Sequence, residues 1–295
     1  RVLVRVAPPR GEHVRPAGED VGEGETVLTA GTRLGAAHLG MLASLGRTRV
    51  AVHRAPRVAI LSSGDELVEP DARDLSGGRI VSSTGISLAA QCREAGALPV
   101  DLGIARDRPE ELERLLGAGL FADVLVSSAG VSVGDHDHVR PVLEKLGCRL
   151  VFWGVRIKPG YPVAYGCFEG PGPRVFGLPG NPVSAMVTFE QLVRPLLLRM
   201  AGHAVVHRPM LEARLAETLT KRPGRMHLVR VVLERDDEGF VARPTGTQSS
   251  GVLRSMTLAH GLLVFPAEAE RLDAGARARV QLLDPERLGA AEPGF

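Results

Sequence analysis

The sequence is poor in cysteine and in aromatic residues, with three cysteines, one tryptophan and two tyrosines among its 295 residues. Cys92, Cys148 and Cys167 lie far apart and form no CxxC pair. This spacing argues against a zinc cluster and against a disulfide framework. We expect the three side chains to be small buried hydrophobic groups in a reducing compartment.

The chain also lacks a marked excess of charge and a long apolar run. Its 36 Lys and Arg residues against 34 Asp and Glu residues leave a formal net charge of +2. The basic residues are scattered, which argues against the basic stripe of a nucleic-acid surface. No segment approaches the roughly 18 to 20 apolar residues of a membrane span, and the N-terminus has no export pattern. These absences predict a cytoplasmic protein with neither a nucleic-acid nor a membrane partner.

What is present is enough apolar material for packed cores, since 44% of the residues are hydrophobic and 24% are charged. We expect two domains or more. The first residue is Arg1, and residues 1–30 are typical of short strand and turn fragments, with Val2, Val4 and Val6 alternating before two prolines. We interpret the chain as beginning partway through a longer protein. Apolar spacing predicts a helix next, ended by Gly46 in a left-handed cap.

From residue 57 the sequence alternates between short apolar runs and amphipathic stretches, a pattern that predicts an α/β domain with a parallel-rich sheet and helices on both faces. The strands are expected at residues 57–61, 98–102, 122–127, 149–155, 162–167 and 174–178. Helices are expected near residues 84–95, 109–118, 137–146 and 182–201, the last with a kink at Pro195. With its preceding helix this domain spans 31–205. Short runs between turns then predict a small C-terminal β domain over 206–286, followed by a loose tail, 287–295.

Ligands bind beyond the carboxyl ends of strands in such sheets, so the loops there are the candidate sites. The loops that attract attention are SSGDEL at 62–67, SSAGVSVGDHD at 127–137, KPGYP at 158–162 and GLPGNPVSA at 177–185. Small residues let the backbone approach a phosphate, and free N–H groups at a helix start attract an anion. Two prolines can hold Lys158 toward a cleft. Asp107 and Asp137, from separate loops, could hold one magnesium ion against a pyrophosphate.

Each of these features also has a purely structural explanation. Ser, Gly and Asp are the residues that turns require anyway. Asp137 could cap the next helix, and Asp107 with Pro109 and Glu110 nearly forms a capping box. Lys158 could simply be solvated. The residues taken singly leave both interpretations open.

Taken in order, the motifs resemble one family, the molybdopterin molybdenumtransferases, which include bacterial MoeA and the E domain of gephyrin. The resemblance is carried by GEHVRPAGED, SSGDEL, GIARD, SSAGVSVGDHDHV, KPGYP, GLPGNPVSAMVTFEQLVRP, GRMHLVR and SSGVLRSMTLAHG. The most specific feature is GLPGNPVSA downstream of GVSVGDHD. The resemblance implies an α/β molybdopterin-binding domain like that of the pathway's adenylyltransferases, with residues 1–30 as the end of a β-rich second domain.

The resemblance implies a transferase that inserts molybdate into adenylylated molybdopterin and releases AMP, as a homodimer with Mg²⁺ as cofactor. Its catalytic residues would be Asp65, Glu66, Asp107 and Asp137, the last two binding the metal. The pterin nucleotide would be bound by Ser63, Gly64, Ser128, Gly130, Ser132, Gly134, Pro179, Gly180, Asn181 and Pro182. Molybdate would be bound by Lys158, Pro162, Ser184, Arg225 and Ser255.

The chain departs from the family pattern at several positions. Tyr161 stands where a lysine is usual, Ala129 where a glycine is usual and His260 where an asparagine is usual. We expect the lost lysine to weaken molybdate binding or to change which anion binds. Two alternatives remain: a molybdopterin adenylyltransferase, against which the GRMHLVR and SSGVLRSM segments argue, and a non-catalytic scaffold that binds a pterin or a peptide.

Overall fold

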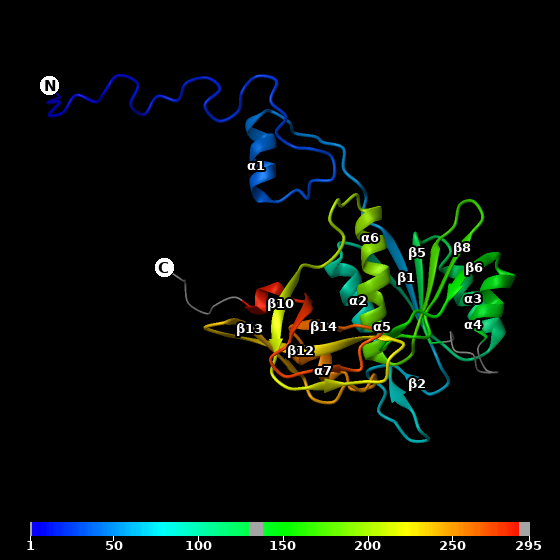
Figure 1. Ribbon diagram of the computed structural model, residues 1–295. Coiled ribbons are helices and arrows are strands. Elements are labelled where there is room, and N and C mark those ends of the chain that lie inside the picture. Colours follow the sequence, from blue (N-terminus) through cyan, green and yellow to red (C-terminus); the bar gives the residue numbers. More distant parts are fainter. Residues whose placement is uncertain (1, 130–137, 289–295) are drawn as a thin grey trace. The chain divides into compact units, whose positions relative to one another are not determined.

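The structure is a computed structural model that describes residues 2–129 and 138–288 (Figure 1). The predicted site residues Gly130, Ser132, Gly134 and Asp137 lie outside the described residues. The chain divides into two compact units, Arg1–Val52 and His53–Phe295. We call them the N-terminal unit and the main unit.

The N-terminal unit consists of turns and one helix, α1 (Ala36–Ser44). Gly46 follows it with φ +68°, which confirms the predicted left-handed position. The expected strand fragments at the start are wrong, because residues 2–52 contain no strand. A strand needs a neighbour to pair its N–H and C=O groups, whereas Val2 and Val4 are 92% and 72% exposed. The helix belongs to this unit, although the sequence pattern grouped it with the α/β domain.

The main unit is built on a six-stranded sheet in the order β4-β1-β5-β9-β8-β6. The pairs β1–β4, β1–β5 and β5–β9 are parallel, and β8 runs antiparallel to both of its neighbours. The parallel-rich sheet is therefore confirmed. Its strands are β1 (Arg57–Ser63), β4 (Leu98–Ala105), β5 (Val124–Ser128), β6 (Cys148–Trp153), β8 (Ala164–Phe168) and β9 (Arg174–Leu178).

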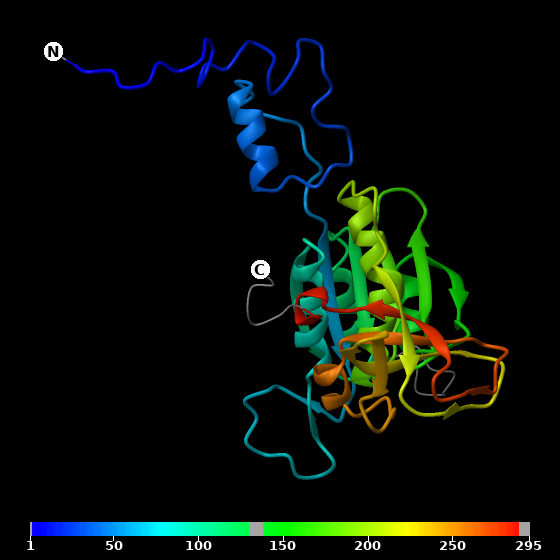
Figure 2. The ribbon, with the colours of Figure 1, turned by 60° about the vertical axis from the view of Figure 1, so that its left-hand side comes forward.

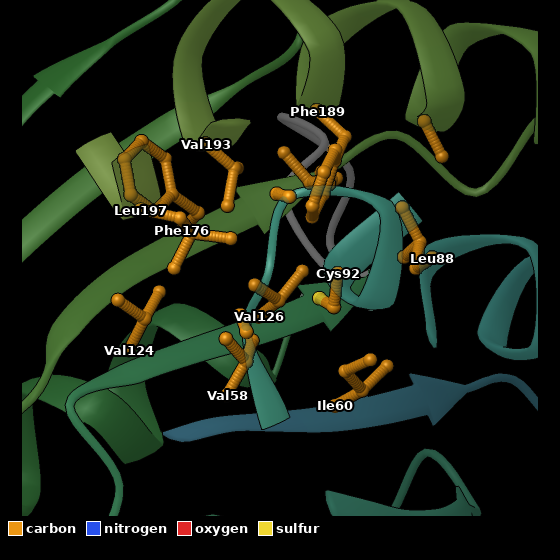
Figure 3. Close-up of a cluster of buried hydrophobic side chains, with 14 of the residues drawn as sticks. Val58, Ile60, Leu88, Cys92, Val124, Val126, Phe176, Phe189, Val193 and Leu197 are labelled. Carbon is orange, nitrogen blue, oxygen red and sulfur yellow. The ribbon is translucent and has the colours of Figure 1, made fainter. Parts of the chain in front are cut away.

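Helices cover both faces of this sheet, as predicted. Val58 and Ile60 of β1 pack into one core, shown in Figure 3, while Ala59 and Leu61 pack into a second core on the other face. Burial on both faces explains why the four residues 58–61 of β1 are all apolar. The first core also receives side chains from α2 (Thr84–Glu94), α5 (Pro182–Thr188) and α6 (Arg194–Met200), and the second from α3 (Pro109–Ala118) and α4 (Val139–Lys145).

The long C-terminal helix of this domain contains an irregular turn. A π-helical segment, Phe189–Val193, separates α5 from α6 and ends just before Pro195. Proline has no N–H, and in a regular α-helix its ring collides with the carbonyl four residues earlier. The wider π turn is a common way to accommodate such a defect. The predicted irregularity is thus present, one turn ahead of the proline.

The C-terminal part forms a small β barrel, which confirms the predicted β domain. β13 pairs with both β10 and β12, and β14 pairs with both β12 and β16, so the strands close on themselves (Figure 2). The barrel strands are β10 (Met210–Leu215), β12 (Met226–Asp236), β13 (Gly239–Pro244), β14 (Gly261–Phe265) and β16 (Arg277–Leu282). The remaining short elements are β2 (Leu67–Val68), β3 (Ile80–Val81), β11 (Leu219–Thr220), β15 (Arg271–Leu272), α7 (Arg254–Leu258) and a 3₁₀ turn, Pro285–Leu288.

One two-residue strand ties the α/β part to the barrel. β7 (Ile157–Lys158) comes from the α/β part of the chain, but it pairs with β12, with Ile157 opposite Met226 and Lys158 opposite His227. This pairing places the Lys158 loop at the start of β12. In the described ranges, no helix is both long enough and apolar enough to cross a membrane.

Candidate active site

The carboxyl edge of the main sheet has a topological switch point between β1 and β5. From β1 the chain continues to β4 on one side, whereas β5 lies on the other side. Ligands of open α/β sheets bind at such a point. Ser128 Oγ lies 3.4 Å from Ser62 Oγ there. The predicted residue Ser63 ends β1, and its buried Oγ has no hydrogen-bond partner in the described part of the chain.

Acidic residues gather beside this point, in the turns that follow β1 and β4. The Asp107 N–H donates to Asp65 Oδ1 over 3.2 Å, and Arg106 Nη1 donates to the Asp65 carbonyl over 2.7 Å. Burial raises the pKa of Asp107 above its ordinary value, and the negative charge of Asp65 raises it further, with a smaller contribution from Glu66. The structure therefore brings together Asp65, Glu66 and Asp107, which we call the acidic group.

The turn that carries the acidic group depends on a glycine. Gly64 has φ +148°, and a Cβ added there would lie 2.7 Å from Glu66 Oε2. Any side chain would therefore push the Glu66 carboxylate away. The predicted substrate residue Gly64 thus has a clear structural role in placing Glu66.

A cavity of about 510 Å³ opens between the β9–α5 turn and the barrel. Lys158 and Arg225 bring positive charge to it, and Ser184 brings a hydroxyl. Predicted anion and substrate residues that line it are Lys158, Pro162, Pro179, Asn181, Ser184 and Arg225. Lining residues that sequence reasoning did not assign to a ligand are Ile157, Pro159, Gly160, Tyr161, Gln248, Ser249 and Ser250.

The Lys158 loop is pressed against α5. Gly160 has φ +108°, and a Cβ there would collide with the Thr188 methyl group. The Lys158–Pro159 peptide bond is cis.

Burial, and then the positive charges of Lys158 and Arg230, lower the pKa of His227 to about 4. His227 is therefore neutral at pH 7 and adds no charge beside Lys158.

Arg230 lies beneath the barrel side of the cavity and forms hydrogen bonds with the segment that lines it. This side chain is fully buried; its Nη2 donates to the Ser249 carbonyl over 3.1 Å and its Nε donates to Ser255 Oγ over 3.1 Å. Burial lowers the pKa of Arg230 to about 10. The Val183 N–H, at the start of α5, donates to the Ser250 carbonyl over 3.1 Å. Helix and barrel thus meet at Ser249 and Ser250.

The structure does not place Ser255 in the cavity lining. It is 1% exposed, and its hydroxyl donates to the Val252 carbonyl over 2.7 Å. Within the SSGVLRSM segment, the serines that line the cavity are Ser249 and Ser250, at its start. A sequence segment that contains three serines does not reveal which of them faces a ligand, because that depends on how the loop packs on Arg230.

Comparisons with known proteins cover nearly the whole chain. Residues 59–199 match the model of a probable molybdopterin binding domain, residues 212–283 that of the MoeA C-terminal region (domain IV), and residues 1–46 that of the MoeA N-terminal region (domains I and II). The molybdopterin molybdenumtransferase of Haemophilus influenzae is 34% identical over 93% of this chain and 68% of its own length. The chain belongs to the molybdopterin molybdenumtransferase family.

Other members of the molybdopterin molybdenumtransferase family agree with this assignment. The protein of that name from Nostoc sp. is 37% identical over 90% of this chain and 62% of its own length. The chain therefore spans about two thirds of the length of these relatives. A crystal structure of the molybdopterin biosynthesis MoeA protein from a Pyrococcus species matches with a TM-score of 0.78 and 34% identity, covering 90% of this chain and 64% of that one. It supports both the fold and the family.

Two departures from the usual molybdopterin molybdenumtransferase pattern can be placed in the structure. His260 has a structural role, because its Nδ1 lies 3.2 Å from both the backbone nitrogen and the carbonyl oxygen of Leu233. Ala129 follows β5 with φ +76°, and its N–H donates to the Leu178 carbonyl over 2.9 Å. Its methyl group fits because Gly180 has no side chain: a Cβ there would lie 3.2 Å from the Ala129 Cβ.

We expect Ala129→Gly to stabilise the protein by about 0.5 to 1 kcal/mol, because it removes an unfavourable left-handed alanine at some cost in unfolded-state entropy. Thermal unfolding measures the effect. Ala90→Gly is the matched control, since Ala90 is exposed within α2 and the same change there should destabilise by a similar amount. A lower melting temperature for Ala129→Gly would contradict the strain at this position.

Proposed function

We propose that this protein transfers molybdenum from molybdate to adenylylated molybdopterin and releases AMP. The observation that carries the proposal is the cavity with Lys158 and Arg225 next to the carboxyl edge of the molybdopterin-domain sheet, where the acidic group lies. A cationic recess suits the oxyanion, and carboxylates suit a metal-bridged phosphoanhydride. The relatives named above carry the same name as this activity.

The cavity lining supports molybdate as the anion. A tetrahedral dianion needs positive charge and fixed hydrogen-bond donors. Lys158 and Arg225 supply two charges, and the hydroxyls of Ser184, Ser249 and Ser250 are at hand as donors. About 510 Å³ exceeds the size of one oxyanion and leaves room for the dithiolene end of the pterin.

The carboxyl edge supports binding of the nucleotide end. Ser62, Ser63 and Ser128 place small polar side chains at the strand ends of the switch point, where ligands of such sheets bind. Asp65 and Asp107 offer carboxylate oxygens, the ligands that Mg²⁺ takes together with substrate phosphates and water. Within residues 2–129 and 138–288, no group of three or more His, Cys, Asp or Glu side chains forms a complete metal site. A bound Mg²⁺ would neutralise phosphate charge here.

The chemistry needs positioning more than a nucleophilic side chain. The two dithiolene sulfurs replace two oxo groups on molybdenum, and each departing oxygen leaves as water. The two thiols supply two of the four protons that this requires, and one further proton is taken up for each departing oxygen. One water cleaves the phosphoanhydride bond, giving the pterin phosphate and AMP. Lys158 and Arg225 would hold the oxyanion, and carboxylates of the acidic group would hold Mg²⁺, whose charge would favour cleavage of the anhydride.

We further propose that the protein acts in the cytoplasm, as a homodimer and with Mg²⁺. The cytoplasm is supported by the three free cysteines, because Cys92, Cys148 and Cys167 form no disulfide. The carboxylate ligand set supports Mg²⁺ over a softer metal. The homodimer rests on the resemblance to the family alone, and the mass of the purified protein in solution tests it.

Replacing Asp107 with asparagine should reduce AMP release by at least about tenfold, because one of the carboxylates that place the anhydride loses its charge. Molybdate binding should stay within about twofold of the wild type, since Asp107 does not line the cavity. AMP release from adenylylated molybdopterin with molybdate and Mg²⁺ is the measurement. Asp71→Asn, at an exposed loop position, is the control. Undiminished AMP release would remove Asp107 from the reaction, and ATP consumption without molybdate would indicate an adenylyltransferase instead.

A further inference from the structure

Tyr161, which stands where the family usually has lysine, lies against the cationic side chain of the cavity. The Arg225 guanidinium carbon sits 4.0 Å from the centroid of the Tyr161 ring, and both residues line the cavity. This distance is well inside the limit of about 6 Å for a cation–π contact. Tyr161 is therefore not simply a lost positive charge, because its ring contacts the Arg225 side chain.

The Tyr161 ring is held in place from its own side. Trp153 meets it edge-on, with ring centroids 5.6 Å apart and planes at 87°. Gly154 packs beside the ring, since a Cβ there would lie in van der Waals contact with Tyr161 Cζ, at 3.5 Å. The Tyr161 carbonyl accepts hydrogen bonds from the N–H groups of Val155 and Val163 over 3.1 and 2.9 Å. The ring is thus packed against Trp153 and Gly154 on its own side, and its backbone is hydrogen-bonded in the loop.

Arg225 needs such a platform. It is exposed at the turn before β12, and it makes no salt bridge with any carboxylate in the described part of the chain. A free arginine side chain loses rotamer entropy when an anion orders it. A guanidinium stacked by its face keeps its in-plane N–H groups available, and these are the donors that grip an oxyanion.

We propose that Tyr161 is a positioning residue for the anion, which holds the Arg225 guanidinium stacked at the cavity so that its N–H edge is ready for the oxyanion. The proposal rests on the proposed function, since it assigns the anion site of that activity. The site then binds a dianion with two cations, Lys158 and an oriented Arg225. The fixed orientation of Arg225 thus compensates for the third positive charge that the family's lysine would supply.

Molybdate titrations by calorimetry on single and double variants test this proposal. Tyr161→Phe keeps the ring and should bind molybdate within about twofold of the wild type. Tyr161→Ala should bind it about three- to tenfold more weakly, the range expected for loss of one cation–π contact. In an Arg225→Ala background, Tyr161→Ala should have almost no further effect, because the partner is already gone. A merely structural role would weaken binding equally in both backgrounds and would overturn the proposal.

Phe121→Ala is the matched control. It removes a second arginine–aromatic contact, with Arg57 at 5.5 Å, at the amino end of the sheet strands, away from the cavity lining. Molybdate affinity should not change there. Loss of affinity in this control comparable to that of Tyr161→Ala would overturn the proposal, because the effect would then not be specific to the cavity.

An NMR measurement separates this inference from the proposed function. The Arg225 Nε–H signal, assigned by its loss in Arg225→Ala, should carry a ring-current shift in the wild type and in Tyr161→Phe that disappears in Tyr161→Ala. A wild-type protein that binds no molybdate contradicts the proposed function and the anion role together. If it binds molybdate but the Arg225 signal does not respond to Tyr161→Ala, the positioning role alone is overturned.

Discussion

Replacing Lys158 with methionine is expected to weaken molybdate binding about tenfold to a hundredfold, since a charge-assisted hydrogen bond contributes about 1.5 to 3 kcal/mol. Lys158 is one of the two cationic side chains in the cavity lining, and β7 holds its backbone against β12. Methionine keeps the length and the apolar stem of the side chain. The loss therefore reports the charge and its hydrogen bonds, and calorimetric titration with molybdate measures it.

Lys145→Met is the matched control for this experiment. Lys145 is 67% exposed on α4, where it pairs with Glu113, and it does not line the cavity. Its replacement should leave molybdate affinity within about twofold, because an exposed ion pair contributes about 0 to 1 kcal/mol. Equal losses in the two variants would mean that the protein attracts molybdate by its overall charge and not by this cavity.

The second large effect is expected at Gly160, where alanine should destabilise the main unit by about 3 to 5 kcal/mol. Two causes add. The backbone has φ +108°, a conformation that residues other than glycine rarely adopt, and the new Cβ would collide with the Thr188 methyl group. Chemical denaturation measures the loss. The Lys158 loop would have to move away from α5 in this variant. The fraction of Gly160→Ala that still folds should therefore also bind molybdate more weakly.

A double variant divides the two causes. Thr188→Ser removes the methyl group but keeps the hydroxyl, which donates to the carbonyls of Ser184 and Ala185. In that background Gly160→Ala should lose only the backbone part. Gly170→Ala shows that part alone, at about 1 to 2 kcal/mol, because Gly170 has φ +88° and no atom within 4 Å of an added Cβ. If Gly160→Ala costs no more than Gly170→Ala, the loop does not pack on α5 as described.

The elements of the α/β part could be predicted from the sequence because their signals are local. The strand Arg174–Leu178 and the helix Pro109–Ala118 have the predicted bounds. A strand buried on both faces is mostly apolar, and a helix start favours proline and acidic residues in its first turn, as Pro109, Glu110 and Glu111 do here, so both leave a mark within a few residues. The same local signal misled at Val2–Val6, where alternation suggested a strand but no partner strand exists in residues 2–52.

The meeting of Asp65 and Asp107 in the acidic group could be predicted from the sequence, because it follows from a general property of parallel sheets. Asp65 and Asp107 follow β1 and β4, and neighbouring parallel strands end at the same edge, so their meeting follows from the fold class. The strands β5 and β9 end at the same edge by the same rule. Motif resemblance then suggested the chemistry of these loops, which the residue types alone left open.

The cavity was decided by tertiary structure. Lys158 and Arg225 meet because two residues of β7 pair with β12, and a two-residue strand has no periodicity by which a sequence could announce it. Which serines line the cavity depends on the buried Arg230, which donates to the Ser249 carbonyl, and the contact of Tyr161 with Arg225 depends on the pairing of β7 with β12. The sequence by itself determined the order of elements and the chemical groups at the strand ends, because these follow from local spacing. Only the packing of the barrel against α5 decided which groups share a cavity, because contacts between distant segments depend on the complementarity of two finished surfaces.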